Sequence, residues 1–145
     1  MYKNGIGTNR DLILALSWYT RAANNGHTLA QNNLGSMYQH GDGVARNYKK
    51  ALELYQKASE QDLAVAITNL GIMYSAGDGI KKDYIKAKIL FERAAQQNYA
   101  PALRELGFLY ANGLGVKWNL RTAIELYNNA ALQGDLKARQ YLDEM

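Results

Sequence analysis

Few side chains in this sequence could perform catalysis. The chain has two histidines, His27 and His40, and no cysteine, so it lacks a thiolate nucleophile and most of the usual ligands of a zinc site. The lysine of a Ser-x-x-Lys motif is missing after every serine, because the third following residue is Thr20, Gln39, Asp62 or Asp78. The sequence therefore predicts no catalytic residue, no metal ion and no cofactor, and it indicates a protein that is not an enzyme.

One glycine-rich segment, Gly41-Asp42-Gly43, lacks the further glycine and the lysine of a phosphate-binding loop. It belongs instead to an internal repeat. The string LGSMYQHGDGV at residues 34–44 recurs as LGIMYSAGDGI at 70–80 and as LGFLYANGLGV at 106–116, offset by 36 residues each time. A period of this length predicts an array of equal supersecondary units.

Within each unit, apolar residues have the spacing of two amphipathic helices, which we term helix A and helix B. Ala30, Leu34 and Tyr38 fall at i, i+4 and i+8 in helix A, and Ala51 and Tyr55 are spaced alike in helix B. Side chains that can cap the start of helix B recur at one column of the repeat: Asp11, Asn47, Asp83 and Asn119. Residues that tolerate a left-handed backbone recur at its end: Gly26, Asp62, Asn98 and Gly134.

Helix A carries a glycine at Gly35, Gly71 and Gly107, where each costs about 0.8 to 1 kcal/mol relative to alanine. We expect these glycines to allow the close approach of helix B.

Trp18 shares a column with Leu54, Leu90 and Leu126, so we expect it to be a packing residue.

These columns resemble the Sel-one-like repeat family, a relative of the tetratricopeptide repeat, over essentially the whole chain. The shared pattern runs from Ala through Leu-Gly, Tyr, Gly-x-Gly-Val and Lys-Ala to Tyr and Ala-Ala; it departs at Leu14, Ser59 and Thr122. The resemblance implies an all-α fold, a right-handed superhelical solenoid of antiparallel helix pairs. It also implies an adaptor for protein complexes, often in bacterial signalling or host interaction. Some bacterial members are secreted, rich in disulfides and described as β-lactam-binding, a branch that the lack of cysteine disfavours.

The register divides the chain into residues 1–27, a partial repeat with loop and helix B, complete repeats at 28–63, 64–99 and 100–135, and a closing helix A at 136–145. Met1-Tyr2 has the register of Met37-Tyr38, which suggests a piece excised from a longer protein. No apolar run is long enough to span a bilayer, so we expect no membrane insertion. The absence of cysteine favours the cytoplasm, although an upstream signal peptide would change that assignment.

We expect the partner-binding surface on the face of helix A opposite its core residues, in the concave groove of the array. This face varies between units, as a specialised groove would, although drift of solvated positions predicts the same variation. Phe108 is the expected anchor, with packing against a neighbouring helix as an equal alternative, whereas Ile72 is expected to pack. The predicted groove comprises Asn32, Ser36, Gln39, His40, Thr68, Ile72, Ser75, Arg104, Phe108, Ala111, Asn112 and Gln140.

Trp118 stands where other units have a cation, and we interpret it as a hydrophobic staple before Asn119 or as a secondary contact surface. The net charge is +4, and basic residues gather near the starts of the B helices. Because acidic residues alternate with these lysines and most tyrosines occupy core columns, we expect no nucleic-acid binding.

The leading hypothesis is a protein–protein interaction scaffold that holds a partner segment in its groove. A small-molecule or β-lactam-binding domain with marginal hydrolase activity is the alternative from another class. A structural spacer of a larger protein that self-associates end to end is a third hypothesis.

Overall fold

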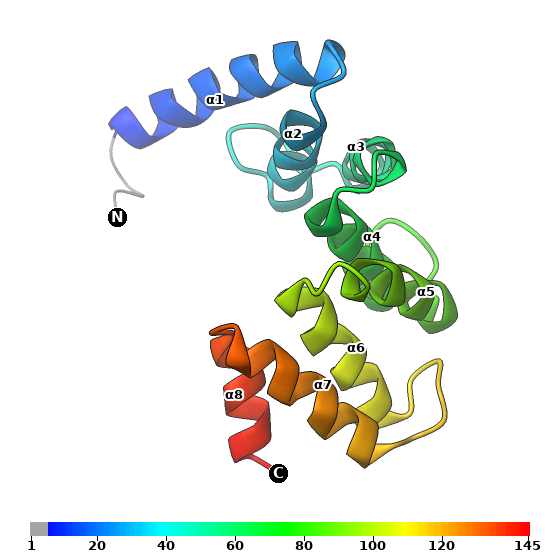
Figure 1. Ribbon diagram of the computed structural model, residues 1–145. Helices are drawn as coiled ribbons and strands as arrows, with labels where there is room; N and C mark the ends of the chain where they lie inside the picture. Colours follow the sequence, from blue (N-terminus) through cyan, green and yellow to red (C-terminus); the bar gives the residue numbers. More distant parts are fainter. Residues whose placement is uncertain (1–5) are drawn as a thin grey trace. The chain divides into compact units, whose positions relative to one another are not determined.

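The computed structural model describes residues 6–145, with side chains from Arg10 onward, and this part of the chain consists of helices joined by loops, with no strand (Figure 1). Its helices form two compact units, an amino-terminal unit with α1–α3 and a carboxy-terminal unit with α4–α8, which begins at Ala64. The helices are α1 (Ile6–Asn24), α2 (Thr28–His40), α3 (Tyr48–Glu60), α4 (Ala64–Ala76), α5 (Tyr84–Ala95), α6 (Ala100–Asn112), α7 (Leu120–Leu132) and α8 (Leu136–Asp143).

Helix pairs are the basic element of both units. The most extensive packing joins α2 to α3, α4 to α5 and α6 to α7, and a short loop connects the members of each pair. Within the carboxy-terminal unit, α5 also packs against α6, α7 against α8, and α4 touches α6. The predicted all-α fold of antiparallel helix pairs is confirmed.

The predicted capping of helix B is confirmed in three repeats. The side chains of Asn47, Asp83 and Asn119 accept hydrogen bonds from the backbone amides of Lys50, Lys86 and Thr122 at 3.0–3.1 Å. At the other end, Asp62 and Asn98 adopt φ values of 63° and 57°, the left-handed region expected for this column.

In the first repeat, the capping prediction was wrong. The helix there begins at Ile6, so Asp11 lies inside α1 and does not cap its start. The residue that follows the Gly-x-Gly pattern is Thr8 instead of the aliphatic residue found elsewhere, so the loop lacks its apolar anchor. Continued helix satisfies the backbone hydrogen bonds that a loop would leave to water. The predicted loop residue Gly5 lies outside the described residues.

Aromatic residues of helix B form the core beneath the glycines of helix A. Tyr55, Phe91 and Tyr127 are each at most 2% exposed. A Cβ atom added at Gly71 would lie 2.6 Å from Cε1 of Phe91, closer than any real contact of this kind. The expectation that these glycines permit close approach of helix B is therefore confirmed.

Trp18 is not the packing residue that its column predicted, because its side chain is 67% exposed. Its counterpart Leu54 packs against a cluster formed by Ala23, Ala30 and Leu34 of the two preceding helices. Within the described part of the chain, no helix precedes α1, so this face of Trp18 has no surface to bury against. The column predicted the residue type, whereas burial depends on the neighbouring pair of helices.

Candidate functional site

In the amino-terminal unit, the predicted groove residues lie in different environments. Asn32 is only 5% exposed, so this prediction of an open groove residue was wrong. Gln39 accepts a hydrogen bond of 2.7 Å from the hydroxyl of Tyr55, and burial raises the pKa of Tyr55 to about 12. Ser36 is half-buried and His40 is exposed, so these two are the open part of the predicted face in α2.

His40 is not arranged as a general base toward Ser36. Its Nδ1 lies 2.9 Å from the Ser36 carbonyl oxygen and 3.4 Å from Oγ of the same residue. A carbonyl oxygen only accepts, so Nδ1 must carry the proton and cannot take one from the serine hydroxyl. In the described part of the chain, no three His, Asp or Glu side chains gather as a metal site.

In the carboxy-terminal unit, two predicted groove residues of α4 belong to its packing. Thr68 is 2% exposed and donates a hydrogen bond to the Ala64 carbonyl at 2.8 Å, so its assignment to an open groove was wrong. Ile72 is partly buried against the cluster that contains Phe91 and Leu106, in agreement with the preferred packing interpretation. Ser75 donates to the Ile72 carbonyl at 2.9 Å and lines a pocket described below.

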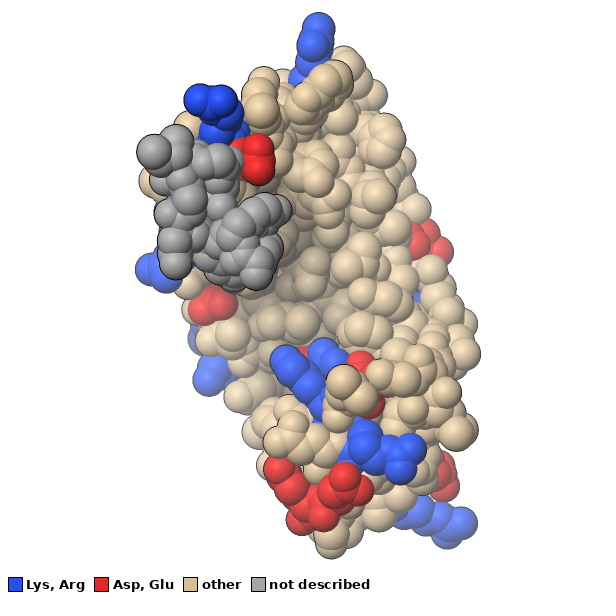
Figure 2. Space-filling view, turned by 90° about the vertical axis from the view of Figure 1, so that its left-hand side faces the viewer, with Lys and Arg blue, Asp and Glu red and all other residues tan. Residues whose placement is uncertain are grey.

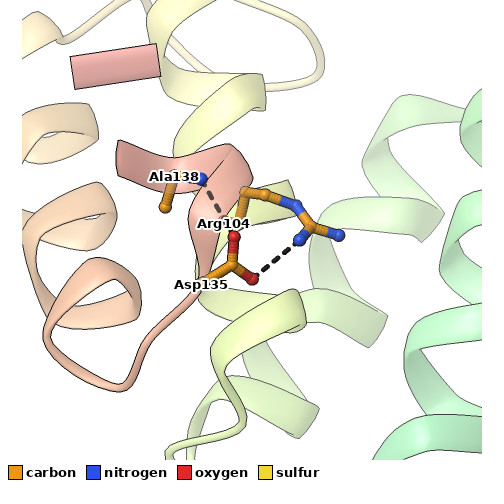
Figure 3. A network of polar contacts seen from close by, with 3 residues as sticks. All are labelled: Arg104, Asp135 and Ala138. Carbon is orange, nitrogen blue, oxygen red and sulfur yellow. Dashed lines mark hydrogen bonds and ion pairs between the residues drawn. The ribbon is translucent and has the colours of Figure 1, made fainter. Parts of the chain in front are cut away.

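Arg104 holds the start of α8 against α6. Its Nη1 lies 2.7 Å from Oδ2 of Asp135, while the other carboxylate oxygen accepts a hydrogen bond of 2.9 Å from the amide of Ala138 (Figure 3). The two charged side chains are only 16% and 6% exposed, so this pair is partly shielded from solvent. Arg104, which we predicted in the open groove, therefore has a structural partner within the chain.

The remaining predicted residues of α6 and α8 are more open. Asn112 is exposed and donates to the Phe108 carbonyl at 2.9 Å, and Gln140 is exposed and lies 3.3 Å from the carboxylate of Glu144. Ala111 is half-buried against the core cluster that contains Tyr127. These contacts leave Phe108 as the large exposed side chain among the groove residues predicted in α6.

Phe108 borders a pocket of about 160 Å³ in the carboxy-terminal unit. Its ring is 38% exposed, and its centroid lies 6.2 Å from that of Tyr141, with the rings tilted by 40°. Tyr141 in turn lies 5.3 Å from the ring of Tyr127. The pocket is lined by Ser75, Tyr84, Phe91, Glu105, Phe108, Leu109 and Tyr141.

Glu105 is the acidic side chain of this pocket. Burial raises the pKa of its carboxyl group above the usual value, and the positive charges of Arg104 and Lys137 oppose that shift in part. The sequence prediction missed Glu105 and Tyr141, which occupy one column of the repeat with Asn33 and Asn69. The change from Asn to Glu and Tyr in this column was a signal that could have found them.

A second exposed aromatic residue, Trp118, lies at the loop before α7. Its indole is 61% exposed, so most of this side chain is not buried against α7. It borders a shallow depression together with Tyr110, Lys88 and Lys117. The hydrophobic staple and the secondary contact surface both stay predictions.

The basic residues near the B helices lie against tyrosines. Lys50 and Lys86 each place Nζ 5.3 Å from a ring centroid, over Tyr38 and Tyr74 respectively. Figure 2 shows Lys and Arg groups interspersed with Asp and Glu groups in its lower part, at the level of α6 to α8 in Figure 1, without a continuous basic stripe there. No helix among residues 6–145 has the length and apolar character of a membrane span.

Packed helix pairs with glycine-rich loops, a 36-residue period and an exposed aromatic pocket define the chain as a helical repeat protein of the tetratricopeptide-like α-solenoid class. The Sel1 repeat profile matches residues 1–27, 28–63, 64–99 and 100–135, and the chain therefore belongs to the Sel1 repeat family. Proteins of this family are generally scaffolds for protein–protein interaction, and most are not enzymes.

Solved structures of bacterial proteins resemble this chain closely. A Sel1 repeat protein from Oxalobacter formigenes is 36% identical with a TM-score of 0.83, over 91% of this chain and 54% of its own. A protective antigen of uropathogenic Escherichia coli strains, with an SLR fold, is 36% identical with a TM-score of 0.85, over 92% of this chain and 29% of its own. The chain thus spans about half of the first relative and less than a third of the second.

A third structure shares the fold alone. Helicobacter pylori cysteine rich protein B is 24% identical with a TM-score of 0.69, over 97% of this chain and 99% of its own. No curated protein matches the sequence.

Proposed function

We propose that this chain is a scaffold that binds a segment of a partner protein at the open residues of α6 and α8 in the carboxy-terminal unit, with Phe108 as the anchor. The observation that carries the proposal is the exposure of the Phe108 ring beside a pocket whose lining includes the buried Phe91 and Leu109. Aromatic side chains at the rim of a formed pocket are the usual anchors of protein interfaces. The bacterial origin of the similar structures favours a bacterial signalling or host-interaction role.

Neighbouring contacts support a preformed site. Tyr141 packs between Phe108 and Tyr127, and the Arg104–Asp135 pair fixes the start of the helix that carries Tyr141. A site held in this way loses little conformational entropy when a ligand binds. The open polar residues Asn112 and Gln140 are suited to contact the backbone of a bound segment.

Site-specific photocrosslinking tests this proposal. Replacement of Phe108 by a benzophenone amino acid in cells of the source organism should capture a defined partner, which mass spectrometry identifies. The same replacement at Glu125, which is exposed on α7, serves as the control position. An excess of wild-type chain without the photocrosslinking residue should abolish the capture. An excess of the Phe108→Asp variant should leave the capture intact.

A matched variant makes the result specific to the pocket. Ile89 is 56% exposed on α5 and does not line the pocket, so Ile89→Asp makes the same chemical change elsewhere. We expect Ile89→Asp to compete like the wild type. If Phe108→Asp competes equally well, the partner binds elsewhere, and Trp118 becomes the next surface to test.

We also propose self-association between copies as a second function, because large apolar side chains are exposed on α1 and around the start of α8. Trp18 and Ile13 on α1 are 67% and 61% exposed, while Leu132 and Leu136 near α8 are 83% and 82% exposed. A head-to-tail contact between copies would bury both sets and would continue into open chains. Light scattering should then show a mass that rises with concentration, and Trp18→Glu should abolish the rise.

A further inference from the structure

The pocket beside Phe108 combines two residues that depart from the repeat at the same column. This column holds Asn33 and Asn69 in the earlier repeats, but Glu105 in α6 and Tyr141 in α8. Both Glu105 and Tyr141 line the pocket. The two residues that replace asparagine in this column therefore lie in one pocket, which places a carboxylate next to aromatic rings.

The Glu105 carboxylate lies near the charges of Arg104 and Lys137 but is bonded to neither in the described part of the chain. Among residues 10–145, no hydrogen bond or ion pair is formed by this carboxylate. The adjacent guanidinium of Arg104 is engaged with Asp135 at 2.7 Å. Because the carboxyl group is half-buried, its charged form lacks part of its hydration, and its pKa is raised accordingly. A cation that enters the pocket would supply the missing partner.

Aromatic rings line the same space. The ring of Phe108 is exposed at the rim, and Tyr141 and Tyr84 lie along the wall. Rings of this kind attract ammonium and guanidinium groups through their electron-rich faces. Tyr84 already has such a contact, because Nζ of Lys82 lies 5.6 Å from its ring centroid, so Phe108 and Tyr141 are the pocket rings that a bound cation would use.

The size of the pocket selects a single side chain. Its volume of about 160 Å³ equals roughly five water molecules at about 30 Å³ each. This space is large enough for the end of one side chain. An acidic side chain would be repelled by the negative charge of Glu105. An aliphatic side chain would displace water from the carboxylate without replacing the hydrogen bonds that the water makes.

We propose that this pocket binds a Lys or Arg side chain of the partner segment, with the cationic group on Glu105 and the aliphatic stem against Phe108. The inference rests on the proposed scaffold function and specifies the chemistry that its partner must present. Arg104 and Lys137 place positive charge near Glu105, and Asp135 places negative charge there. Because Arg104 and Asp135 are paired with each other, Glu105 is the group that decides the preference.

Selection from a displayed library of random dodecapeptides tests the inference with the full chain. Peptides selected on the wild type should share a basic residue at one position, and replacement of that residue by norleucine or glutamate should weaken binding at least tenfold. Glu105→Gln keeps the shape of the side chain and removes its charge, so the selected peptides should bind this variant about tenfold more weakly. Glu125→Gln, which removes an exposed carboxylate of α7, should leave their affinity unchanged.

The outcomes separate the two proposals. If the selected peptides bind the Phe108 surface but share no basic residue, or bind Glu105→Gln as tightly as the wild type, the basic pocket is refuted and the scaffold function stands. If no peptide is selected above background, both proposals fail. Circular dichroism of Glu105→Gln checks that weaker peptide binding does not come from loss of the fold. We expect this variant to be folded, because removal of the partly buried charge should stabilise the chain.

Discussion

Gly71 offers the most direct test of how the helix pairs are packed. In an exposed helix, Gly→Ala would stabilise by about 1 kcal/mol, because alanine has the higher helix propensity. At this position, however, the added methyl group would lie 2.6 Å from Cε1 of Phe91 and within 3.2 Å of two further ring atoms. The nearest approach is about 0.8 Å shorter than an ordinary contact of 3.4 Å.

The ring of Phe91 has little room to retreat. It is 1% exposed and packs with Ala87, Leu106 and Leu109 in one buried cluster. Overpacking of a close-packed core costs about 1 to 3 kcal/mol, and the short contact here places the cost near the upper value. After the gain in helix propensity, we expect Gly71→Ala to destabilise the chain by about 2 kcal/mol, or a fall in Tm of about 6 °C.

Urea unfolding followed by circular dichroism measures this change, and a double-mutant cycle assigns its cause. On a Phe91→Leu background the clash is absent, so Gly71→Ala should become neutral or stabilising by up to about 1 kcal/mol. Gly107→Ala should cost less than Gly71→Ala, because its nearest ring contact would be 2.9 Å. The packing argument would be refuted if Gly71→Ala stabilised the otherwise wild-type chain. It would also be refuted if Gly71→Ala reduced stability equally in the wild-type and Phe91→Leu backgrounds.

Further predictions concern capping, ion pairing and titration. Asn119→Ala should reduce stability by about 1 kcal/mol in urea unfolding while Asn119→Asp retains it, because only the side-chain oxygen caps α7. Arg104→Met should cost about 2 kcal/mol by the same assay, because it leaves the 6% exposed Asp135 carboxylate with its cap contact alone. Glu105→Gln should raise Tm at neutral pH, and the gain should disappear below pH 4.5, because the raised pKa means that folding disfavours the charged form. Burial raises the pKa of Tyr127 to about 12 from an ordinary value of 10.0. The contribution of its neutral side chain to stability should therefore be complete below pH 10 and lost between pH 10 and 12. Absorbance at 295 nm would record the titration, and circular dichroism would record the loss of structure.

The parts of the fold that the sequence predicted are those set by local chemistry repeated in register. Asn47 and Asn119 cap helices because their side chains reach the amide three residues ahead, and this requires no distant neighbour. Asp62 and Asn98 likewise follow the backbone preference of their own positions. Such features recur every 36 residues, so each repeat supported the same interpretation.

The failures occurred where burial depends on neighbouring helices. Trp18 occupies a packing column, yet the surface that covers its counterparts does not exist among the described residues. Thr68 was placed on an open face by the helical step, but an A helix packs on more than one side. For example, α6 contacts α5, α7 and α4, which leaves a narrow open strip.

That open strip explains why the sequence analysis found Phe108 and missed Glu105. The two residues are three positions apart and Asn112 follows four later, so one side of α6 carries all three. The predicted face was centred one residue earlier, at Arg104, whose side chain instead bonds to Asp135. A helical wheel cannot distinguish these alternatives, because the contacts that bury one edge of the helix come from α8.

The ion pair and the pocket are connected through α8. Asp135 uses one carboxylate oxygen to hold Arg104 and the other to cap the helix, so the start of α8 is attached to α6 on the side next to Glu105. One and a half turns further along α8, Tyr141 lies between Phe108 and Tyr127. The departures from the repeat in α6 and α8 are therefore coupled. Arg104 and Asp135 position the helix, Tyr141 completes the wall, and the unpaired carboxylate of Glu105 determines which side chain the pocket can accept.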